Sequence, residues 1–330
     1  MGAKPRARPS SARPAPEAEG PEVTVVVVTH NSAELLAAFF AALPSALSGV
    51  NGHEVVVADN LSRDGTLELV TELQPGATLV DLGRNAGYAA GINAAIRRAS
   101  GNARAVLVCN PDVRLHSGSV RRLLDGLTHP GVGIAVPRLL ESDGRLALSL
   151  RREPRILRAL GEALVGGTRA GWLTPFGEVV CDPRRYERPG CADWACGAVM
   201  LISRRCLESV GPWDETFFLY SEETEFALRA RDAGFALRYV PDAVATHLGG
   251  DRHVSSQLWT LLTINRVRLY SRRNGRLRTA TFWAVVTLNE ALRALAGRAA
   301  ARAALPVLLR PRSWAARTTQ PRAEGVPATP

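Results

Sequence analysis

The chain has 330 residues, of which 46% are hydrophobic, and a formal net charge of +10. This length is enough to bury a large core, in one merged domain with tails or in two domains. The five cysteines are odd in number and lack a paired Cys-x-x-Cys arrangement, which argues against both a disulfide framework and a zinc site.

Both ends of the chain have the composition of disordered tails. Residues 1–21 are rich in Pro, Ala and Arg without an apolar run, which indicates a disordered basic tail rather than a signal peptide. Residues 313–330 are similar in composition. With no signal peptide, we expect a cytoplasmic protein with reduced thiols.

Four short apolar runs are typical of strands buried on both faces. They lie at residues 23–30, 54–58, 77–82 and 105–109, and helical patterns separate them. This alternation predicts an α/β fold. Each run ends on polar residues, and ligands bind outside the carboxyl ends of the strands in open parallel sheets. We therefore expect one crevice lined by Thr29, His30, Asp59, Asn85 and Asp112.

A helix is predicted directly after the first strand. Asn31 and Glu34 have the spacing of a capping box, in which side chains satisfy backbone N–H groups of the first turn. Apolar residues recur on one face of this helix at Leu35, Leu36, Phe39, Phe40 and Leu43.

Much farther along the chain, a helix after Ser221 is expected to begin with an acidic first turn. Its carboxylates are Glu222, Glu223 and Glu225. A purely structural interpretation is available, because carboxylates are favoured at a helix N-terminus, Ser221 is a good N-cap, and Arg229 could pair with Glu225. The aromatic patch that precedes the turn favours function instead, since it would press the acidic turn against other groups.

Seven segments in this order resemble the inverting family 2 glycosyltransferases, particularly the branch that contains bacterial rhamnosyltransferases. They are VVVVTHNS, VVVADNLSRDGT, GRNAGYAAGINAAI, VLVCNPDV, ACGAVMLISR, VGPWDETFFLYSEETEFALRARDAG and YVPDAVATH, within residues 23–250. The resemblance implies a GT-A fold over residues 22–250, with a mostly parallel central sheet and flanking helices. It also implies transfer of a sugar, rhamnose from dTDP-rhamnose, to a glycan or lipid-linked acceptor in cell-envelope polysaccharide synthesis.

The resemblance implies a divalent cation, Mg²⁺ or Mn²⁺, beside the donor diphosphate. Asp112 occupies the position of the family's Asp-x-Asp metal motif, whose first carboxylate is replaced here by Asn110. His247 matches a family histidine that completes the metal and diphosphate site in several members. Hard cations prefer oxygen ligands, and a neutral imidazole can serve as a second protein ligand.

The nucleotide site that the resemblance implies centres on Asp59, which matches a carboxylate that binds the pyrimidine base. Asn60 and Asp64 lie beside it in the sequence, and Asn85 and Gly87 begin a turn into a helix whose N-terminus favours phosphate. The other nucleotide-site candidates are Thr29, His30, Asn31, Asn93 and Asn110.

An inverting transfer needs a base for the acceptor hydroxyl. The family places an acidic pair, commonly Glu-Asp, where this chain has Glu222 and Glu223. We predict that Glu223 is the base, with Glu222 as the alternative. The residues predicted to shape the sugar and acceptor pocket are Trp213, Asp214, Tyr220 and Arg229.

Arginines interleave with apolar residues in the C-terminal region, residues 251–312. Such basic amphipathic helices suit an anionic membrane surface, which predicts a peripheral protein on the inner face of the plasma membrane. The alternative is that these helices pack on the catalytic domain. Nucleic acid is not expected as a partner, because no recognisable reader module accompanies the arginines.

Two other functions compete with catalysis of sugar transfer. The Asn110 and Glu223 departures from the family pattern suggest a catalytically silent nucleotide-sugar-binding or scaffold protein. A nucleotidyltransferase of similar topology would leave the aromatic and acidic segment unexplained, and it predicts a glycine-rich loop near the N-terminus that VTHNS does not contain.

Overall fold

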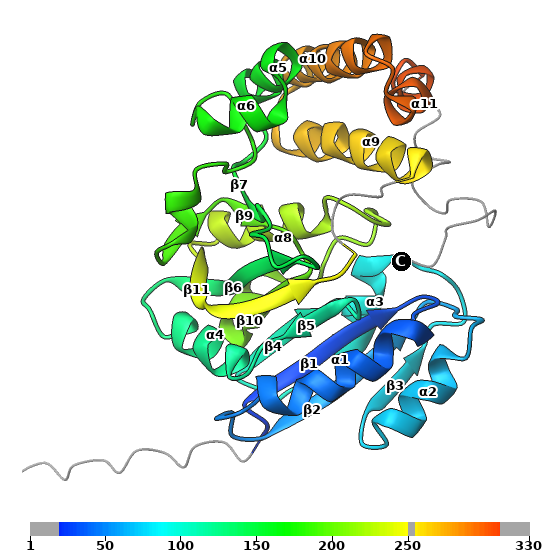
Figure 1. Ribbon diagram of the computed structural model, residues 1–330, viewed down its shortest axis with the longest axis vertical. Helices are drawn as coiled ribbons and strands as arrows, with labels where there is room; N and C mark the ends of the chain where they lie inside the picture. The colour runs from blue at the N-terminus through cyan, green and yellow to red at the C-terminus, as the bar shows by residue number, and fades with distance from the viewer. Residues whose placement is uncertain (1–19, 250–254, 311–330) are drawn as a thin grey trace, which may run out of the picture.

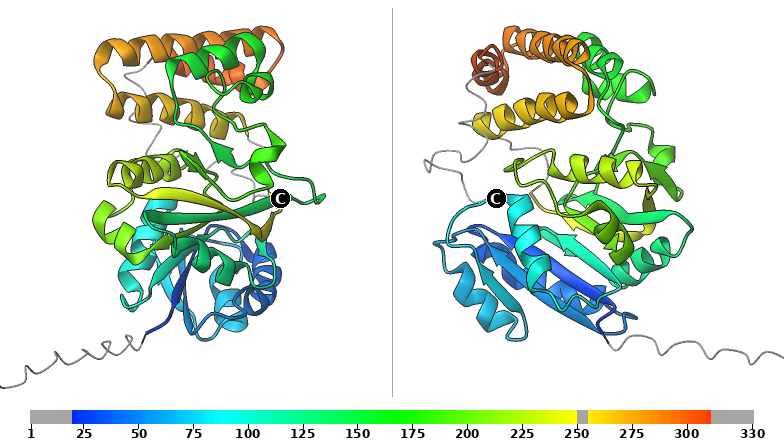
Figure 2. Two further views of the ribbon diagram at one scale, coloured as in Figure 1. Left: turned by 90° about the vertical axis from the view of Figure 1, so that its left-hand side faces the viewer. Right: turned by 180° about the vertical axis from the view of Figure 1, so that it is seen from behind.

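The computed structural model describes residues 20–249 and 255–310, so the predicted tail at 313–330 and nearly all of the tail at 1–21 lie outside the described residues. A central sheet has helices packed on it, and a further layer of helices is stacked at one end (Figures 1 and 2). The α/β class and the mostly parallel sheet are confirmed.

Nine strands form the central sheet within the described residues. They are β1 (Val23–Thr29), β2 (His53–Asp59), β3 (Thr78–Asp81), β4 (Ala105–Cys109), β5 (Val113–Leu115), β6 (Val132–Glu141), β8 (Gly190–Ala192), β10 (Val199–Ser203) and β11 (Ala236–His247). A separate small sheet pairs β7 (Leu150–Arg151) with β9 (Trp194–Ala195). The four strands predicted from apolar runs are β1 to β4.

The helices that pack on the central sheet or link its strands are α1 (Ala33–Ala46), α2 (Thr66–Leu73), α3 (Tyr88–Arg98), α4 (Ser119–Leu127), α7 (Arg204–Val210), α8 (Glu222–Asp232) and the 3-10 turn η1 (Pro183–Tyr186). We call the remaining helices the helical layer: α5 (Ile156–Val165), α6 (Gly167–Trp172), α9 (Ser256–Arg273), α10 (Arg276–Leu295) and α11 (Ala299–Leu308).

Strand direction explains why polar strand ends meet at one edge. The sheet order is β3-β2-β1-β4-β10-β6-β11-β5, with β8 paired to β11. The strands β1, β2, β3, β4, β6 and β11 point the same way, and β5, β8 and β10 run against them. The carboxyl ends of β1 and β2 are in register, with Thr29 opposite Asp59. The carboxyl end of β11, at His247, lies opposite Val113 at the start of β5.

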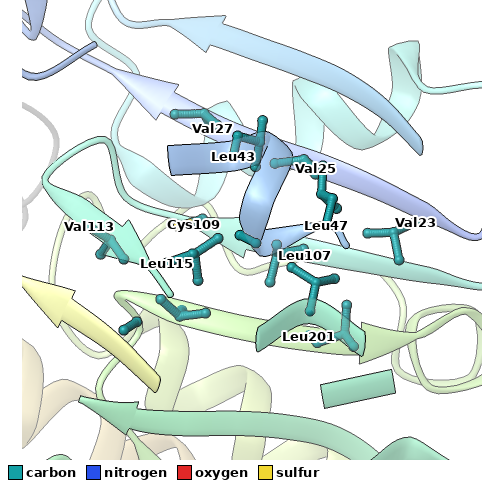
Figure 3. Close-up of a cluster of buried hydrophobic side chains, with 14 of the residues drawn as sticks. Val23, Val25, Val27, Leu43, Leu47, Leu107, Cys109, Val113, Leu115 and Leu201 are labelled. Atoms are coloured by element: carbon teal, nitrogen blue, oxygen red, sulfur yellow. The ribbon is translucent and has the colours of Figure 1, made fainter. Parts of the chain in front are cut away.

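The valine run of β1 is buried on both faces, as its sequence predicts. Val23, Val25 and Val27 belong to one core cluster, which also holds α1 and is drawn in Figure 3. Val26 and Val28 point to the opposite face and pack in a second cluster with α3 and α8. The period of two between these sets is the pleat of a strand.

The predicted capping box at the start of α1 is wrong. Asn31 has a left-handed backbone with φ of 51°, and its Oδ1 accepts a hydrogen bond from the N–H of Arg63. The N-cap position is Ser32, and the first backbone N–H, of Ala33, donates instead to Asp64 at 3.0 Å. A carboxylate from the following loop therefore replaces the local cap.

The C-terminal helices pack against a segment from the middle of the chain. Tyr270 of α9 stacks on Phe282 of α10 with ring centroids 4.0 Å apart, and Phe282 is fully buried. Arg266 of α9 pairs with Glu162 of α5 at 2.7 Å and with Glu178 at 2.6 Å. The helical layer is thus held together by its own core and buried ion pairs, and it includes residues that precede the predicted boundary at 250.

Candidate active site

The two predicted metal ligands lie side by side at the sheet edge. Nε2 of His247, the last residue of β11, is 3.1 Å from Oδ2 of Asp112, which follows β4. The backbone N–H of Leu248 donates to the carbonyl of Asp112 at 2.9 Å and fixes the two segments together. The second carboxylate oxygen, Oδ1 of Asp112, is buried and accepts no hydrogen bond from the described residues.

This pair fits a divalent cation bound partly by its substrate. An orphaned buried carboxylate oxygen is costly unless something binds it, and carboxylate oxygen is the preferred ligand of Mg²⁺ and Mn²⁺. Within residues 20–249 and 255–310, no group of three or more His, Cys, Asp or Glu side chains could hold a metal ion. Backbone or amide oxygens, water and a bound diphosphate are the other oxygen ligands that such a cation accepts.

Most of the predicted nucleotide-site residues lie in a set of loops that hydrogen bonds join to one another. Asp59 is fully buried and accepts from the hydroxyls of Thr29 at 2.7 Å and Ser62 at 2.5 Å. Nδ1 of His30 lies 2.7 Å from the carbonyl of Asn60, where a ring N–H can donate. The loops after β1 and β2 are therefore locked to each other.

The turn before α3 is attached to the same set. Asn60 donates from Nδ2 to the carbonyl of Gly87 and accepts at Oδ1 from the N–H of Ala86. Oδ1 of Asn85 accepts from the N–H of Gly87 at 3.2 Å. A Cβ on Gly87 would lie 2.4 Å from the carbonyl oxygen of Phe218, so only glycine fits this close approach.

Asp64 joins the set through short hydrogen bonds. Burial acts to raise the pKa of its carboxyl, but hydrogen bonds from Thr66 and from the N–H of Ala33 outweigh burial and lower that pKa. The carboxylate therefore stays ionised beside the N-terminus of α1, where a negative charge is favoured.

Two predicted nucleotide-site residues make other contacts. Asn93 is buried on α3 and exchanges hydrogen bonds with the backbone of Trp213, at 2.9 Å each way, so it fastens the loop at 213 rather than facing the set of loops. Oδ1 of Asn110 accepts from the hydroxyl of Tyr88 at 2.5 Å. Asn110 thus faces α3, close to Asp112.

The acidic pair begins α8 in two different environments. Glu222 is 4% exposed, and burial together with the neighbouring Glu223 raises the pKa of its carboxyl. Glu223 packs on Gly197, where an added Cβ would lie 3.1 Å from the Cβ of Glu223. Ala198 directly follows Gly197 in the chain, and its carbonyl accepts a hydrogen bond from the N–H of Asn110 at 2.9 Å. Glu223 therefore lies beside the segment that carries Asp112.

Ser221 occupies the N-cap position of α8 but does not act as predicted. Its backbone is left-handed, with φ of 76°, and its side chain makes no capping hydrogen bond. The expected pair within the helix does form, with Nε of Arg229 2.6 Å from Glu225. The unusual backbone at Tyr220 and Ser221 turns the acidic pair inward.

Glu223 and Tyr220 line a cavity of about 340 Å³ between α8, the β7–β9 sheet and the helical layer. Trp194 and Trp259 contribute aromatic faces to the same cavity. Charged side chains line it as well, among them Arg151, Glu178 and Arg266. The cavity therefore offers space for an acceptor next to the predicted base.

The other three residues predicted for the sugar and acceptor pocket do not line this cavity. Trp213 is 2% exposed and stacks on Phe226 with centroids 4.5 Å apart. Asp214 binds Thr216 and Arg272 at the molecular surface. Arg229 donates to the carbonyls of residues 210 and 212 and braces that loop rather than a phosphate.

Comparison with known proteins assigns the family. Residues 24–172 match the description Glycosyl transferase family 2, and residues 184–286 match Glycosyl transferase family group 2. The chain is 32% identical over 235 residues to an N-acetylglucosaminyl-diphospho-decaprenol L-rhamnosyltransferase of Mycobacterium tuberculosis, covering 68% of this chain and 75% of the relative. The chain belongs to the family 2 glycosyltransferases.

Other relatives agree with this glycosyltransferase assignment. A low-salt glycan biosynthesis hexosyltransferase of Haloferax volcanii is 29% identical over 213 residues, covering 64% of this chain and 62% of the relative. The fold matches a mannosyltransferase of Pyrobaculum calidifontis solved with GDP-Man and Mn²⁺, with a TM-score of 0.55, 19% identity and coverage of 90% of this chain and 84% of that one. The GT-A fold expected from the sequence is therefore confirmed.

Sequence reasoning missed Tyr88 as a neighbour of the site. Burial raises the pKa of its hydroxyl well above the ordinary value, and the charges of Glu222 and Asp112 contribute in the same direction. Tyr88 therefore lies within electrostatic range of both the acidic pair and the metal pair. Its place in GRNAGYAAGINAAI, directly after Gly87, was the available signal.

Proposed function

We propose that this glycosyltransferase is a metal-dependent inverting rhamnosyltransferase, which moves rhamnose from dTDP-rhamnose to a lipid-linked or glycan acceptor in cell-envelope polysaccharide synthesis. The observation that carries the proposal is the position of Glu223, which lines the 340 Å³ cavity and packs beside the segment of Asp112. The choice of rhamnose and of a lipid-linked acceptor is supported by the mycobacterial relative.

In this mechanism Glu223 accepts the proton of the acceptor hydroxyl. The hydroxyl oxygen then attacks the anomeric carbon from the side opposite the diphosphate, and the bond from that carbon to the diphosphate breaks with inversion. Asp112 and His247 would hold a divalent cation, which when bound stabilises the charge that grows on the leaving diphosphate. The loops locked by Asp59 and Asn60 would hold the nucleotide.

Peripheral attachment to the inner face of the plasma membrane is part of the proposal. Among the described residues, no helix combines the length and apolar character required to cross a bilayer. The exposed large apolar side chains of the same residues, apart from Leu61 and Leu248, all lie in residues 157–176 or on α10 and just after α11. Exposed apolar side chains gathered on one part of a protein mark a surface for a partner or a membrane.

Substitution of the acidic pair tests this function. Glu223→Gln keeps the size and shape of the side chain but cannot accept the proton, so turnover should fall by at least about 10²-fold while donor affinity changes little. Glu222→Gln should reduce turnover less, since Glu222 is buried and biased toward its protonated form. Product formation and donor calorimetry give the two readouts.

Three outcomes of this test carry information. A larger loss in Glu222→Gln would assign the base to Glu222. Unchanged turnover in both variants would refute the mechanism. Donor binding with neither transfer nor donor hydrolysis in the wild-type protein would favour the silent nucleotide-sugar-binding protein that the Asn110 and Glu223 departures suggest.

A further inference from the structure

A second cavity, of about 490 Å³, is lined by both residues of β7, and we call it the arginine cavity. Its charged lining consists of five arginines and two aspartates: Arg151, Arg152, Arg158, Arg185, Arg231, Asp182 and Asp193. The positive charges outnumber the negative ones, and none of these residues belongs to the predicted nucleotide or metal site.

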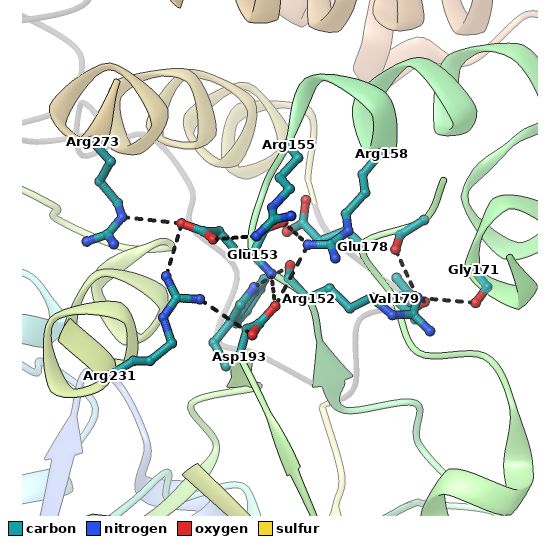
Figure 4. Close-up of polar contacts among 12 residues, drawn as sticks. Arg152, Glu153, Arg155, Arg158, Gly171, Glu178, Val179, Asp193, Arg231 and Arg273 are labelled. Carbon is teal, nitrogen blue, oxygen red and sulfur yellow. Dashed lines mark hydrogen bonds and ion pairs between the residues drawn. The ribbon is translucent and has the colours of Figure 1, made fainter. Parts of the chain in front are cut away.

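Nearby carboxylates offset only part of this charge, because each is shared among several arginines. Asp193 pairs with Arg231 at 3.4 Å and with Arg158 at 3.8 Å, and Glu153 pairs with Arg231 at 3.2 Å and with Arg155 at 3.5 Å (Figure 4). Arg152 donates to backbone carbonyls, those of Gly177 at 2.9 Å and Val179 at 3.0 Å. Carbonyls orient a guanidinium but do not cancel its charge.

Arg158 is the most informative member of the set. The residue is 9% exposed, and its Nε is buried with no acceptor among the described residues. Burial lowers the pKa of its guanidinium, Asp193 and Glu178 oppose this, and the charges of Arg155 and Arg152 lower it further, so that the pKa is lowered overall. The carboxylates present therefore compensate this buried cation only partly, and a further anion beside it would stabilise it.

The position of the arginine cavity connects it with both the acceptor and the membrane. Arg151 lines the arginine cavity and also the 340 Å³ cavity that holds Glu223. Trp172, 57% exposed, lines the arginine cavity from α6. Further exposed apolar side chains of the same segment are Leu157, Leu164, Val165, Leu173 and Phe176. An anionic group bound here would therefore lie near Trp172 of this apolar segment and near Arg151, which also lines the cavity of the predicted base.

We propose that the arginine cavity binds the diphosphate of a lipid-linked acceptor, whose lipid follows the apolar residues of α5 and α6 and whose sugar enters the 340 Å³ cavity. This inference rests on the proposed function, because it assigns a place to the acceptor of that reaction. Arginine suits the ligand, since its planar group makes paired charge-assisted hydrogen bonds to phosphate oxygens.

Vesicle binding by the full chain tests the inference without any donor. Neutral phosphatidylcholine vesicles would carry a polyprenyl diphosphate, the matching uncharged polyprenol, or phosphatidylglycerol at equal total charge. The wild-type chain should sediment preferentially with the diphosphate vesicles, and Arg185→Gln should weaken that binding about fivefold to tenfold. Arg184→Gln is the matched control, because Arg184 is the exposed neighbour of Arg185 on η1 and does not line the cavity.

Arg158→Gln, with a melting temperature measured alongside, should weaken binding at least as much as Arg185→Gln. Equal loss in Arg185→Gln and Arg184→Gln, or equal binding of phosphatidylglycerol and diphosphate vesicles by the wild type, would overturn the inference. Binding of inorganic pyrophosphate without preference for the diphosphate lipid would overturn it in favour of a free anion. If the chain transfers sugar but does not bind the diphosphate lipid, only this inference is refuted. If it binds the lipid but transfers no sugar, only the proposed function is refuted.

Discussion

The buried carboxyl of Glu222 should make the stability of the protein fall as pH rises. Burial and the charge of Glu223 raise the pKa of Glu222 above its ordinary value of 4.5. The native state therefore binds a proton more tightly than the unfolded chain, so this stability is full below about pH 4.5 and is lost as pH rises toward the native pKa.

The size of the effect follows from proton linkage. Each pH unit between the unfolded and native pKa values of Glu222 lowers the free energy of unfolding by up to about 1.4 kcal/mol. For a domain of more than 200 residues, this corresponds to roughly 2–4 °C in melting temperature per unit. Glu222→Gln removes the titration, because an amide stays neutral throughout.

Thermal unfolding of wild type and Glu222→Gln between pH 4.5 and 7.5 provides the assay. The variant should melt near the wild type at pH 4.5 and progressively above it as pH rises. Glu34→Gln is the matched control, since Glu34 also lies in the first turn of a helix but is exposed. A constant difference between Glu222→Gln and wild type across this range would refute the reasoning.

Two other substitutions test the site loops and the metal pair. Asp112→Ala should abolish transfer with the fold intact, and EDTA should inhibit the wild type in the same way. Full activity of the variant in chelated buffer would remove the metal from the mechanism. Gly87→Ala should lower the melting temperature and donor affinity, because its Cβ would lie 2.4 Å from the carbonyl oxygen of Phe218, at a cost of about 1–3 kcal/mol beyond backbone strain. Gly83→Ala, also at positive φ but with no atom within 4 Å of the new Cβ, isolates that strain, and equal losses in the two variants would contradict the clash.

The strand pattern was predictable because its cause is local. The β-branched runs of β1, β2 and β4 are buried on both faces, so they appear in the sequence as continuous apolar segments. Their parallel direction then brings the polar strand ends to one edge. The meeting of Asp112 and His247, which are far apart in the chain, was predictable only because the motifs resemble those of a family.

Side-chain partners across the fold were not predictable from the motifs. Asn93 and Trp213 are chemically suited to a ligand site, yet they are 120 residues apart and satisfy each other within the interior. A polar residue in a motif is equally suited to holding a loop. The same holds for Asp64, whose capping of α1 depends on a loop from the next unit of the fold.

Deleting residues 279–330 would test the membrane surface poorly, because the deletion removes part of a core. Phe282 and Val286 are buried against Tyr270 and Val267 of α9. Loss of one buried Phe costs about 3–5 kcal/mol, so the truncated chain should melt well below the full one. The double variant Leu277→Ser and Leu295→Ser is sharper, because these side chains are 82% and 84% exposed and their loss leaves the core intact. We expect unchanged melting but weaker sedimentation with anionic vesicles, whereas equal sedimentation of variant and wild type would show that α10 does not contact the membrane.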